Sequence, residues 1–210
     1  MSDVIQVSPR FKVNRKNWEI TSTRLGEGPF EFYDKTAARL IYQDRMQGWF
    51  FDPVHMLIEN YQTVVAVHIV TPLIEALENY IRGESSRRNS GDFFKSRAKV
   101  IFPCLDKTTV DLLYKGVRCG FAHEGFLKDD EQKYNILIAL EGTDSPIIYK
   151  YPEMTIYTRQ YVTEIQDEFK KYYSQLENDE AELDKFFRVW KKQWDMKGPT
   201  RIELSGTHSN

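Results

Sequence analysis

The sequence predicts a mainly α-helical fold, a bundle of four to six helices with a small β-hairpin insertion. Apolar residues recur at helical spacing along most of the chain, and two short runs near 134–151 have the composition of strands. Because 41% of the 210 residues are hydrophobic, the chain can bury one sizeable core. We expect an irregular N-terminal arm over 1–35, one helical domain over 36–195 and a flexible tail over 196–210.

The first half of the domain carries two helical patterns. A short helix is expected over 36–46, and Asp52 followed by Pro53 then supplies the cap and first-position proline with which a long helix begins. The apolar period continues beyond Pro72, where a proline inside the helix predicts a break or a bend. His68 falls on the expected apolar face, which favours a hydrogen-bonded core histidine.

The second half of the domain is expected to contain the hairpin and the closing helices. Residues 134–140 and 147–151 flank a turn-forming segment, so we expect the two runs to pair with each other. Apolar and aromatic residues between Tyr161 and Trp194 recur at three and four positions, which predicts one or two helices. Such an aromatic stripe is typical of a core or a dimer interface rather than of a base-stacking surface.

Composition limits the kinds of partner that the chain can take. A formal charge of −2 provides no global attraction for nucleic acid, so RNA binding would depend on a local patch. Two cysteines and four histidines at these spacings predict no metal site, and no cofactor motif is present. The run 64–70 is much shorter than the roughly twenty residues of a membrane span. With no signal-like segment at the N-terminus, these features indicate a cytoplasmic protein without a membrane partner.

The most informative stretch is 118–123, Arg-Cys-Gly-Phe-Ala-His. Arginine can hold a phosphate through a planar fork of donors, and histidine exchanges a proton near its usual pKa of about 6.5. On a straight helix, residues five apart are rotated by roughly 140° and would point apart. Gly120 is therefore expected to end the helix in the left-handed conformation, so that His123 turns back toward Arg118.

A helix is expected to carry this motif. Asp106 is a candidate N-cap, and an apolar stripe of helical period follows it at Val110, Leu113, Val117 and Phe121. An alternative needs no chemistry, because an arginine near a helix C-terminus and a histidine just beyond it can both be ordinary capping residues.

At the motif the chain resembles the HEPN superfamily, whose mark is an arginine, a polar residue, three variable positions and a histidine. The wider run 112–126 is similar to the family in having an apolar helix before the motif and a glutamate, Glu124, after the histidine. The resemblance implies a helical bundle that commonly dimerises and a metal-independent endoribonuclease. Cys119 departs from the family pattern, because a thiol is a weaker hydrogen-bond partner than an amide or a carboxylate.

The resemblance also implies roles for the residues of the motif. His123 would act as general base on an RNA 2′-hydroxyl or as acid to the leaving oxygen, and Arg118 would stabilise the phosphorane, with Cys119 and Glu124 in support. One histidine cannot easily make both proton transfers, so a homodimer with two facing motifs belongs to the hypothesis. Two alternatives stay open: a non-catalytic HEPN-like module that binds RNA, a nucleotide or a protein, which Cys119 favours, and a helical dimerisation scaffold.

A second candidate for phosphate contact is the segment 82–99, with six basic residues against two acidic ones. Its predicted RNA-binding residues are Arg87, Arg88, Lys95 and Arg97. A solvated loop is the competing interpretation. A toxin, an antiviral effector and a housekeeping RNA-binding protein all fit these features, so the biological role and any neutralising partner protein stay open.

Overall fold

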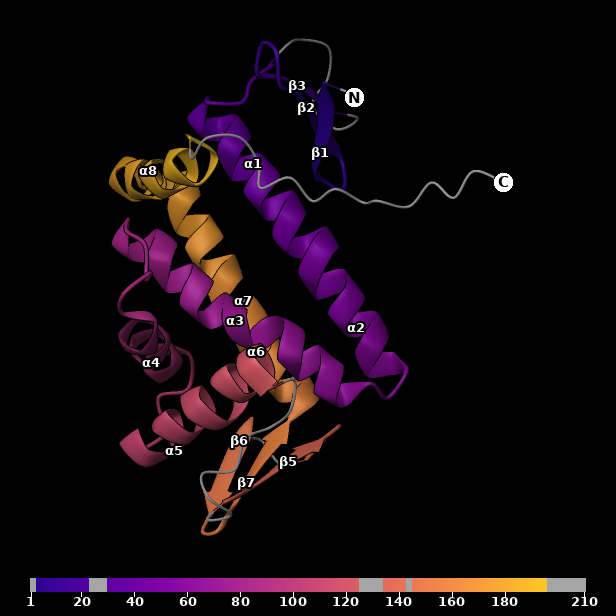
Figure 1. Cartoon of the computed structure of the whole chain (residues 1–210), viewed down its shortest axis with the longest axis vertical. Coiled ribbons are helices and arrows are strands. Elements are labelled where there is room, and N and C mark those ends of the chain that lie inside the picture. Colours follow the sequence, from indigo (N-terminus) through magenta and orange to yellow (C-terminus); the bar gives the residue numbers. More distant parts are fainter. Residues whose placement is uncertain (1–2, 23–29, 125–133, 143–144, 196–210) are drawn as a thin grey trace.

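The computed structural model describes residues 3–22, 30–124, 134–142 and 145–195. Within these ranges the chain forms six continuous helical stretches and two small sheets (Figure 1). The prediction of a mainly α fold is confirmed. The two sheets lie at opposite ends of the molecule, with the helices between them (Figure 1).

The first helical stretch is longer than the sequence predicted. α1 (Lys35–Met46) continues through the π-helical η1 (Gln47–Phe51) into α2 (Asp52–Glu59) without leaving helical dihedral angles. The helix start expected at Asp52 is therefore wrong, because the chain enters α2 already helical through the π turn η1. Gly48 is required within this turn, since a Cβ there would clash with the ring of Pro9.

The central helix is α3 (Thr63–Arg82), which packs against α2, α4, α7 and α8. The break lies at residues 60–62 rather than at Pro72, which is exposed inside the continuous helix. The Thr71 hydroxyl donates to the Val67 carbonyl over 2.6 Å, on the turn that the proline interrupts. Gly83 ends α3 with φ of 71°, a conformation that glycine adopts without strain.

α3 alone, among the helices of the described residues, is long and apolar enough to cross a membrane by length and composition. The run 64–70 considered from the sequence was shorter than this 20-residue helix. However, 56% of its most apolar window is buried inside the bundle, and Glu75 and Glu78 face neighbouring helices. These are the properties of a core helix in a compact domain.

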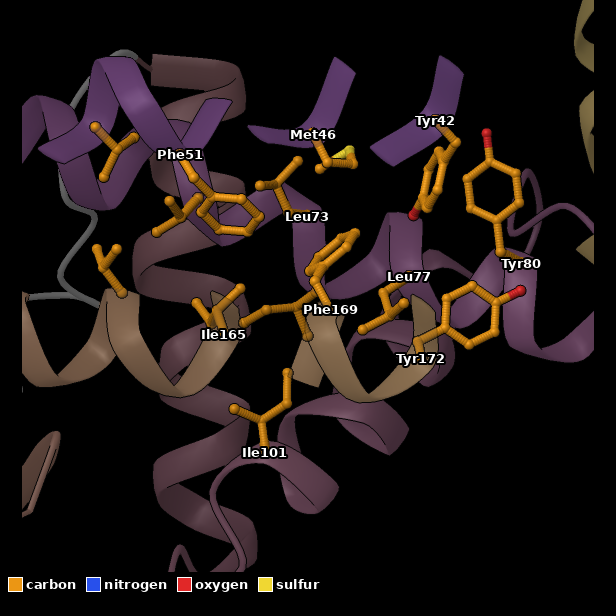
Figure 2. Close-up of a cluster of buried hydrophobic side chains, with 14 of the residues drawn as sticks. Tyr42, Met46, Phe51, Leu73, Leu77, Tyr80, Ile101, Ile165, Phe169 and Tyr172 are labelled. Atoms are coloured by element: carbon orange, nitrogen blue, oxygen red, sulfur yellow. The ribbon is translucent and has the colours of Figure 1, made fainter. Parts of the chain in front are cut away.

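The remaining helices surround α3. They are α4 (Ser90–Ile101), α5 (Lys107–Leu112) with the π-helical η2 (Leu113–Cys119) and α6 (Gly120–Glu124), α7 (Thr158–Asn178), and α8 (Glu180–Asp195). Figure 2 shows the core where α1, η1, α3 and α7 meet, filled by side chains such as Phe51, Leu77 and Phe169. The aromatic stripe predicted after Tyr161 contributes to this core, and Trp190 on α8 is fully buried.

Four strands occupy the region where an irregular arm was expected. β1 (Val4–Ser8), β2 (Phe11–Asn14), β3 (Glu19–Ser22) and β4 (Phe30–Glu31) form an antiparallel sheet in chain order, and β1 packs against α1. Buried Asp44 on α1 accepts hydrogen bonds from the Ser8 hydroxyl at 2.7 Å and the Arg10 amide at 2.9 Å. This carboxylate joins the sheet to the bundle. The tail expected over 196–210 lies outside the described residues.

The second sheet contains the predicted strands in a different pairing. It comprises β5 (Asn135–Ala139), β6 (Ile147–Lys150) and β7 (Glu153–Tyr157) in the order β5-β7-β6. The hairpin joins β6 to β7 through Tyr151 and cis-Pro152, while β5 runs parallel to β7. The pairing expected within 134–151 is therefore wrong, because the buried strand β7, with Met154 and Ile156 in the core, lies between the two.

Candidate functional site

The motif is carried by the helical stretch α5–η2–α6, which begins as predicted. The Asp106 carboxylate accepts from the Thr109 amide and hydroxyl, each at 2.7 Å, and these bonds lower the pKa of Asp106. The predicted apolar stripe is buried at all four positions, Val110, Leu113, Val117 and Phe121. The local sequence thus fixes both where this helix begins and which face it buries.

The helix does not end at Gly120. Gly120 has right-handed dihedral angles, φ −56° and ψ −52°, and its amide donates to the Lys115 carbonyl five residues earlier. The left-handed turn predicted there is wrong. The buried side chain of Phe121 keeps the chain helical beyond Gly120. The π turns of η2 are wider than α-helical turns, so they rotate the residues that follow relative to those of α5.

Arg118 is held by a carboxylate from the central helix. Its Nε and Nη2 donate to Oε2 of Glu75 at 3.1 and 2.8 Å, and 22% of the Arg118 side chain is exposed. The other carboxylate oxygen of Glu75 accepts from the Ser86 hydroxyl at 2.6 Å. Arg118 is therefore oriented by α3 and by the loop before α4, not by the carbonyls of its own helix.

His123 lies in α6, but its side chain and that of Glu124 lie outside the described residues. The expected meeting of imidazole and guanidinium stays a prediction. His68 does lie beside this helix: its exposed ring stacks on Phe121 with centroids 4.6 Å apart. The core position favoured for His68 is wrong, because the break at 60–62 gives α3 a phase different from that of α2.

Cys119 is half-buried and lines an open groove of about 400 Å³. The groove lies along α5 and η2 and is closed on one side by Tyr134, just before β5. Its lining residues are Thr108, Asp111, Leu112, Lys115, Gly116, Cys119 and Tyr134. Arg118, which directly precedes Cys119, is thus close in the chain to a concave surface.

The predicted phosphate-binding residues do not form one patch. Arg87 and Arg88 are exposed in the loop, and Lys95 on α4 forms a 2.6 Å ion pair with Asp111 on α5. Arg97 is buried against Glu78 and Glu168, because it shares the inner face of α4 with Phe93 and Phe94. Arg97 is therefore not available at the surface for RNA.

Two glutamates on α3 organise these arginines, and sequence reasoning did not single them out. Glu75 binds Arg118, whereas Glu78 binds Arg97 and Arg82. Burial alone would raise the pKa of Glu78, but hydrogen bonds from Arg82 and Arg97 outweigh it and lower the pKa. The sequence feature that indicates these ion pairs is the presence of two carboxylates three residues apart in an apolar helix, since buried charges require partners.

The described residues contain no group of three or more histidine, cysteine, aspartate or glutamate side chains placed to hold a metal ion. The site is built instead from one arginine, its carboxylate partner and a groove. Comparison with known proteins identifies no relative: no family model, no curated protein and no solved structure matches this chain.

Proposed function

We propose that this chain is a HEPN-like, metal-independent endoribonuclease in which Arg118 holds the scissile phosphate and His123 transfers protons. The observation that carries the proposal is the setting of Arg118. Its guanidinium is oriented by Glu75 from another helix and is partly exposed, and Arg118 belongs to the π-helical segment η2, whose next residue, Cys119, lines an open groove. π-Helical turns occur frequently at functional sites, which supports a role beyond capping.

The guanidinium of Arg118 has donors left for a ligand. A guanidinium carries five N–H donors, and Glu75 accepts two of them. The remaining three have no partner among the described residues. A phosphate oxygen reaching them would gain charge-assisted hydrogen bonds from a group that is already oriented, which favours stabilisation of a phosphorane.

The reaction would proceed by attack of the 2′-hydroxyl oxygen on phosphorus. A base removes the hydroxyl proton, the bond from phosphorus to the 5′ oxygen breaks, and an acid protonates that oxygen, leaving a 2′,3′-cyclic phosphate. His123 supplies one of these groups. A facing His123 in a homodimer supplies the other, and His68, exposed beside Phe121, offers a second imidazole within the same chain.

Replacement of His123 tests the proposal. We expect His123→Ala to lower the cleavage rate of a generic RNA at least about a hundredfold, because general acid–base catalysis contributes that much or more. The helical circular dichroism signal should not change. His55→Ala is the matched control, since His55 is exposed on α2 and its Nε2 contacts Gln166. Unchanged cleavage by pure His123→Ala protein excludes the mechanism.

The second candidate is a non-catalytic HEPN-like module that binds RNA, a nucleotide or a protein. The Arg118–Glu75 ion pair favours it, because the carboxylate offsets part of the positive charge that a phosphorane requires. Cys119 in place of the family's polar residue favours it too. Ligand binding without turnover, abolished by Arg118→Ala, would support the module, whereas products ending in 2′,3′-cyclic phosphate would support the enzyme.

A further inference from the structure

The groove beside Cys119 has features of its own that the motif does not use. We name it the Lys115 groove and define it by its lining residues along α5 and η2 together with Tyr134. Its volume of about 400 Å³ is within the range of small-molecule sites, but it is open along one side. An open groove of this kind accepts an extended chain more readily than an enclosed ligand.

Positive charge exceeds negative charge around the Lys115 groove. Asp111 is its acidic lining residue, and a hydrogen bond from Lys95, together with the charges of Lys107 and Lys115, lowers the pKa of Asp111. Lys107 and Lys115 are exposed, so their ammonium groups can reach a ligand in solution. Three lysines face two carboxylates, Asp111 and Asp106, the second of which also acts on Tyr149, so a local excess of one positive charge favours an anionic ligand.

Tyrosine rings extend the groove onto the second sheet. Tyr134 contacts Tyr149 with ring centroids 6.3 Å apart and Tyr151 with centroids 6.0 Å apart at 88°. Tyr151 is 73% exposed, unlike the aromatic residues of α7 and α8 that fill the core. Exposed rings next to lysines are the combination that binds single-stranded nucleic acid, because bases stack on the rings while cations contact the phosphates.

We propose that the Lys115 groove binds single-stranded RNA, with Lys115 on a backbone phosphate and the Tyr134–Tyr151 pair stacking on unpaired bases. This inference rests on the proposed function, since it supplies the path by which a strand reaches Arg118. The strand is single because the bases of a duplex are already stacked and cannot reach a ring. Cys119, a residue of the motif, lines the groove and directly follows Arg118 in the chain.

Binding of a fluorescent single-stranded RNA carrying 2′-O-methyl groups tests the groove without cleavage, because the attacking hydroxyl is absent. We expect Lys115→Gln to reduce the slope of log affinity against log salt by about 0.7, the contribution of one phosphate contact. Tyr151→Ala should weaken binding about tenfold, the effect of losing one stacked base, and leave the slope unchanged. Tyr134→Phe should bind like the wild type, because the ring remains.

Two exposed residues elsewhere are matched controls. Lys191→Gln changes a lysine on α8, at the other end of the molecule from α5 (Figure 1), and Tyr61→Ala changes a tyrosine that is 78% exposed after α2. Neither should alter affinity. A fluorescent RNA duplex should bind more weakly than the single strand, and Tyr151→Ala should not affect it.

The outcomes separate the groove from the nuclease. Wild-type affinity for the single strand in both Lys115→Gln and Tyr151→Ala overturns the groove, and cleavage by the wild type would still support the enzyme. Equal binding of duplex and single strand, unaffected by Tyr151→Ala, also overturns it. Binding that depends on Lys115 and Tyr151, in a protein that cleaves no RNA, supports the groove and removes the nuclease.

Discussion

Two arginines reach the central helix from neighbouring helices, and their surroundings differ. Arg97 on α4 contacts Glu78 at 2.8 Å and Glu168 on α7 at 2.7 Å, and 11% of its side chain is exposed. Arg118 on η2 contacts Glu75 at 2.8 Å and is twice as exposed, at 22%. The two α3 carboxylates are three residues apart, so they lie on one face of the helix.

The difference lies in how completely each arginine is paired. Around Glu78 and Glu168, three cations, Arg82, Arg97 and Lys171, contact two carboxylates, so both carboxylates are fully paired. Around Glu75, one arginine and the neutral Ser86 hydroxyl share a single carboxylate. A balanced, buried network holds helices together, whereas a partly exposed arginine with donors to spare is suited to bind a ligand. The difference therefore points to a structural role for Arg97 and leaves Arg118 as the candidate for ligand binding.

Removing the head of Arg97 should have the largest effect. Arg97→Met keeps the apolar stem but leaves part of Glu78 unpaired and Glu168 with the longer 3.5 Å contact to Lys171, and breaking a buried pair in this way costs about 3 kcal/mol of unfolding free energy. Urea unfolding measures the loss. Arg88→Ala, an exposed arginine in the preceding loop, should change stability by no more than about 0.5 kcal/mol. A loss of similar size in both variants would contradict the structural role of Arg97.

Arg118→Met should lower the free energy of unfolding less than Arg97→Met does, but it should abolish the proposed RNA activity. Arg118→Met leaves Glu75 with the Ser86 hydroxyl and some solvent contact, so we expect a loss of about 2 kcal/mol, typical of a hydrogen bond to a charged group. RNA cleavage, or RNA binding in the non-catalytic case, should disappear at temperatures where the variant is folded. If Arg118→Met is destabilised as much as Arg97→Met and keeps its RNA activity, the distinction between the two arginines fails.

Sequence patterns predicted what is local in this fold. The cap at Asp106, the buried stripe of the motif helix and the aromatic core of α7 and α8 all depend on residues close together in the chain. The buried position of Arg97 could also be predicted from the sequence, because Arg97 follows Phe93 by four residues. The helical period of α4 places Arg97 on the same face as the buried Phe93.

The rest depends on contacts between distant residues. The ion pair from Glu75 to Arg118 spans 43 positions, and no local pattern identifies which buried carboxylate meets which arginine. The pairing of β5 with β7 is similarly non-local. The break before α3 was missed because the apolar period continues across residues 60–62, and the end of the motif helix was misplaced because Gly120 was expected to be left-handed and is right-handed.

The smallest predicted effect tests whether Glu75 positions Arg118. Ser86→Ala removes the hydroxyl that donates to Oε1 of Glu75, and we expect a loss of about 1 kcal/mol by urea unfolding, because the carboxylate keeps Arg118. If the hydroxyl fixes the carboxylate, and through it the guanidinium, RNA cleavage should fall while the apparent affinity for RNA changes little.

Ser90→Ala is the matched serine variant, because the Ser90 hydroxyl contacts the Tyr114 hydroxyl at 3.0 Å and has no contact with Glu75. It should lose a similar amount of stability and keep full cleavage. A fall in cleavage confined to Ser86→Ala makes Ser86 and Glu75 positioning residues for Arg118. Equal cleavage by both variants means that the carboxylate of Glu75 holds the guanidinium of Arg118 without help from the loop. Glu75 would then fix Arg118 through their ion pair alone, as Glu78 fixes Arg97.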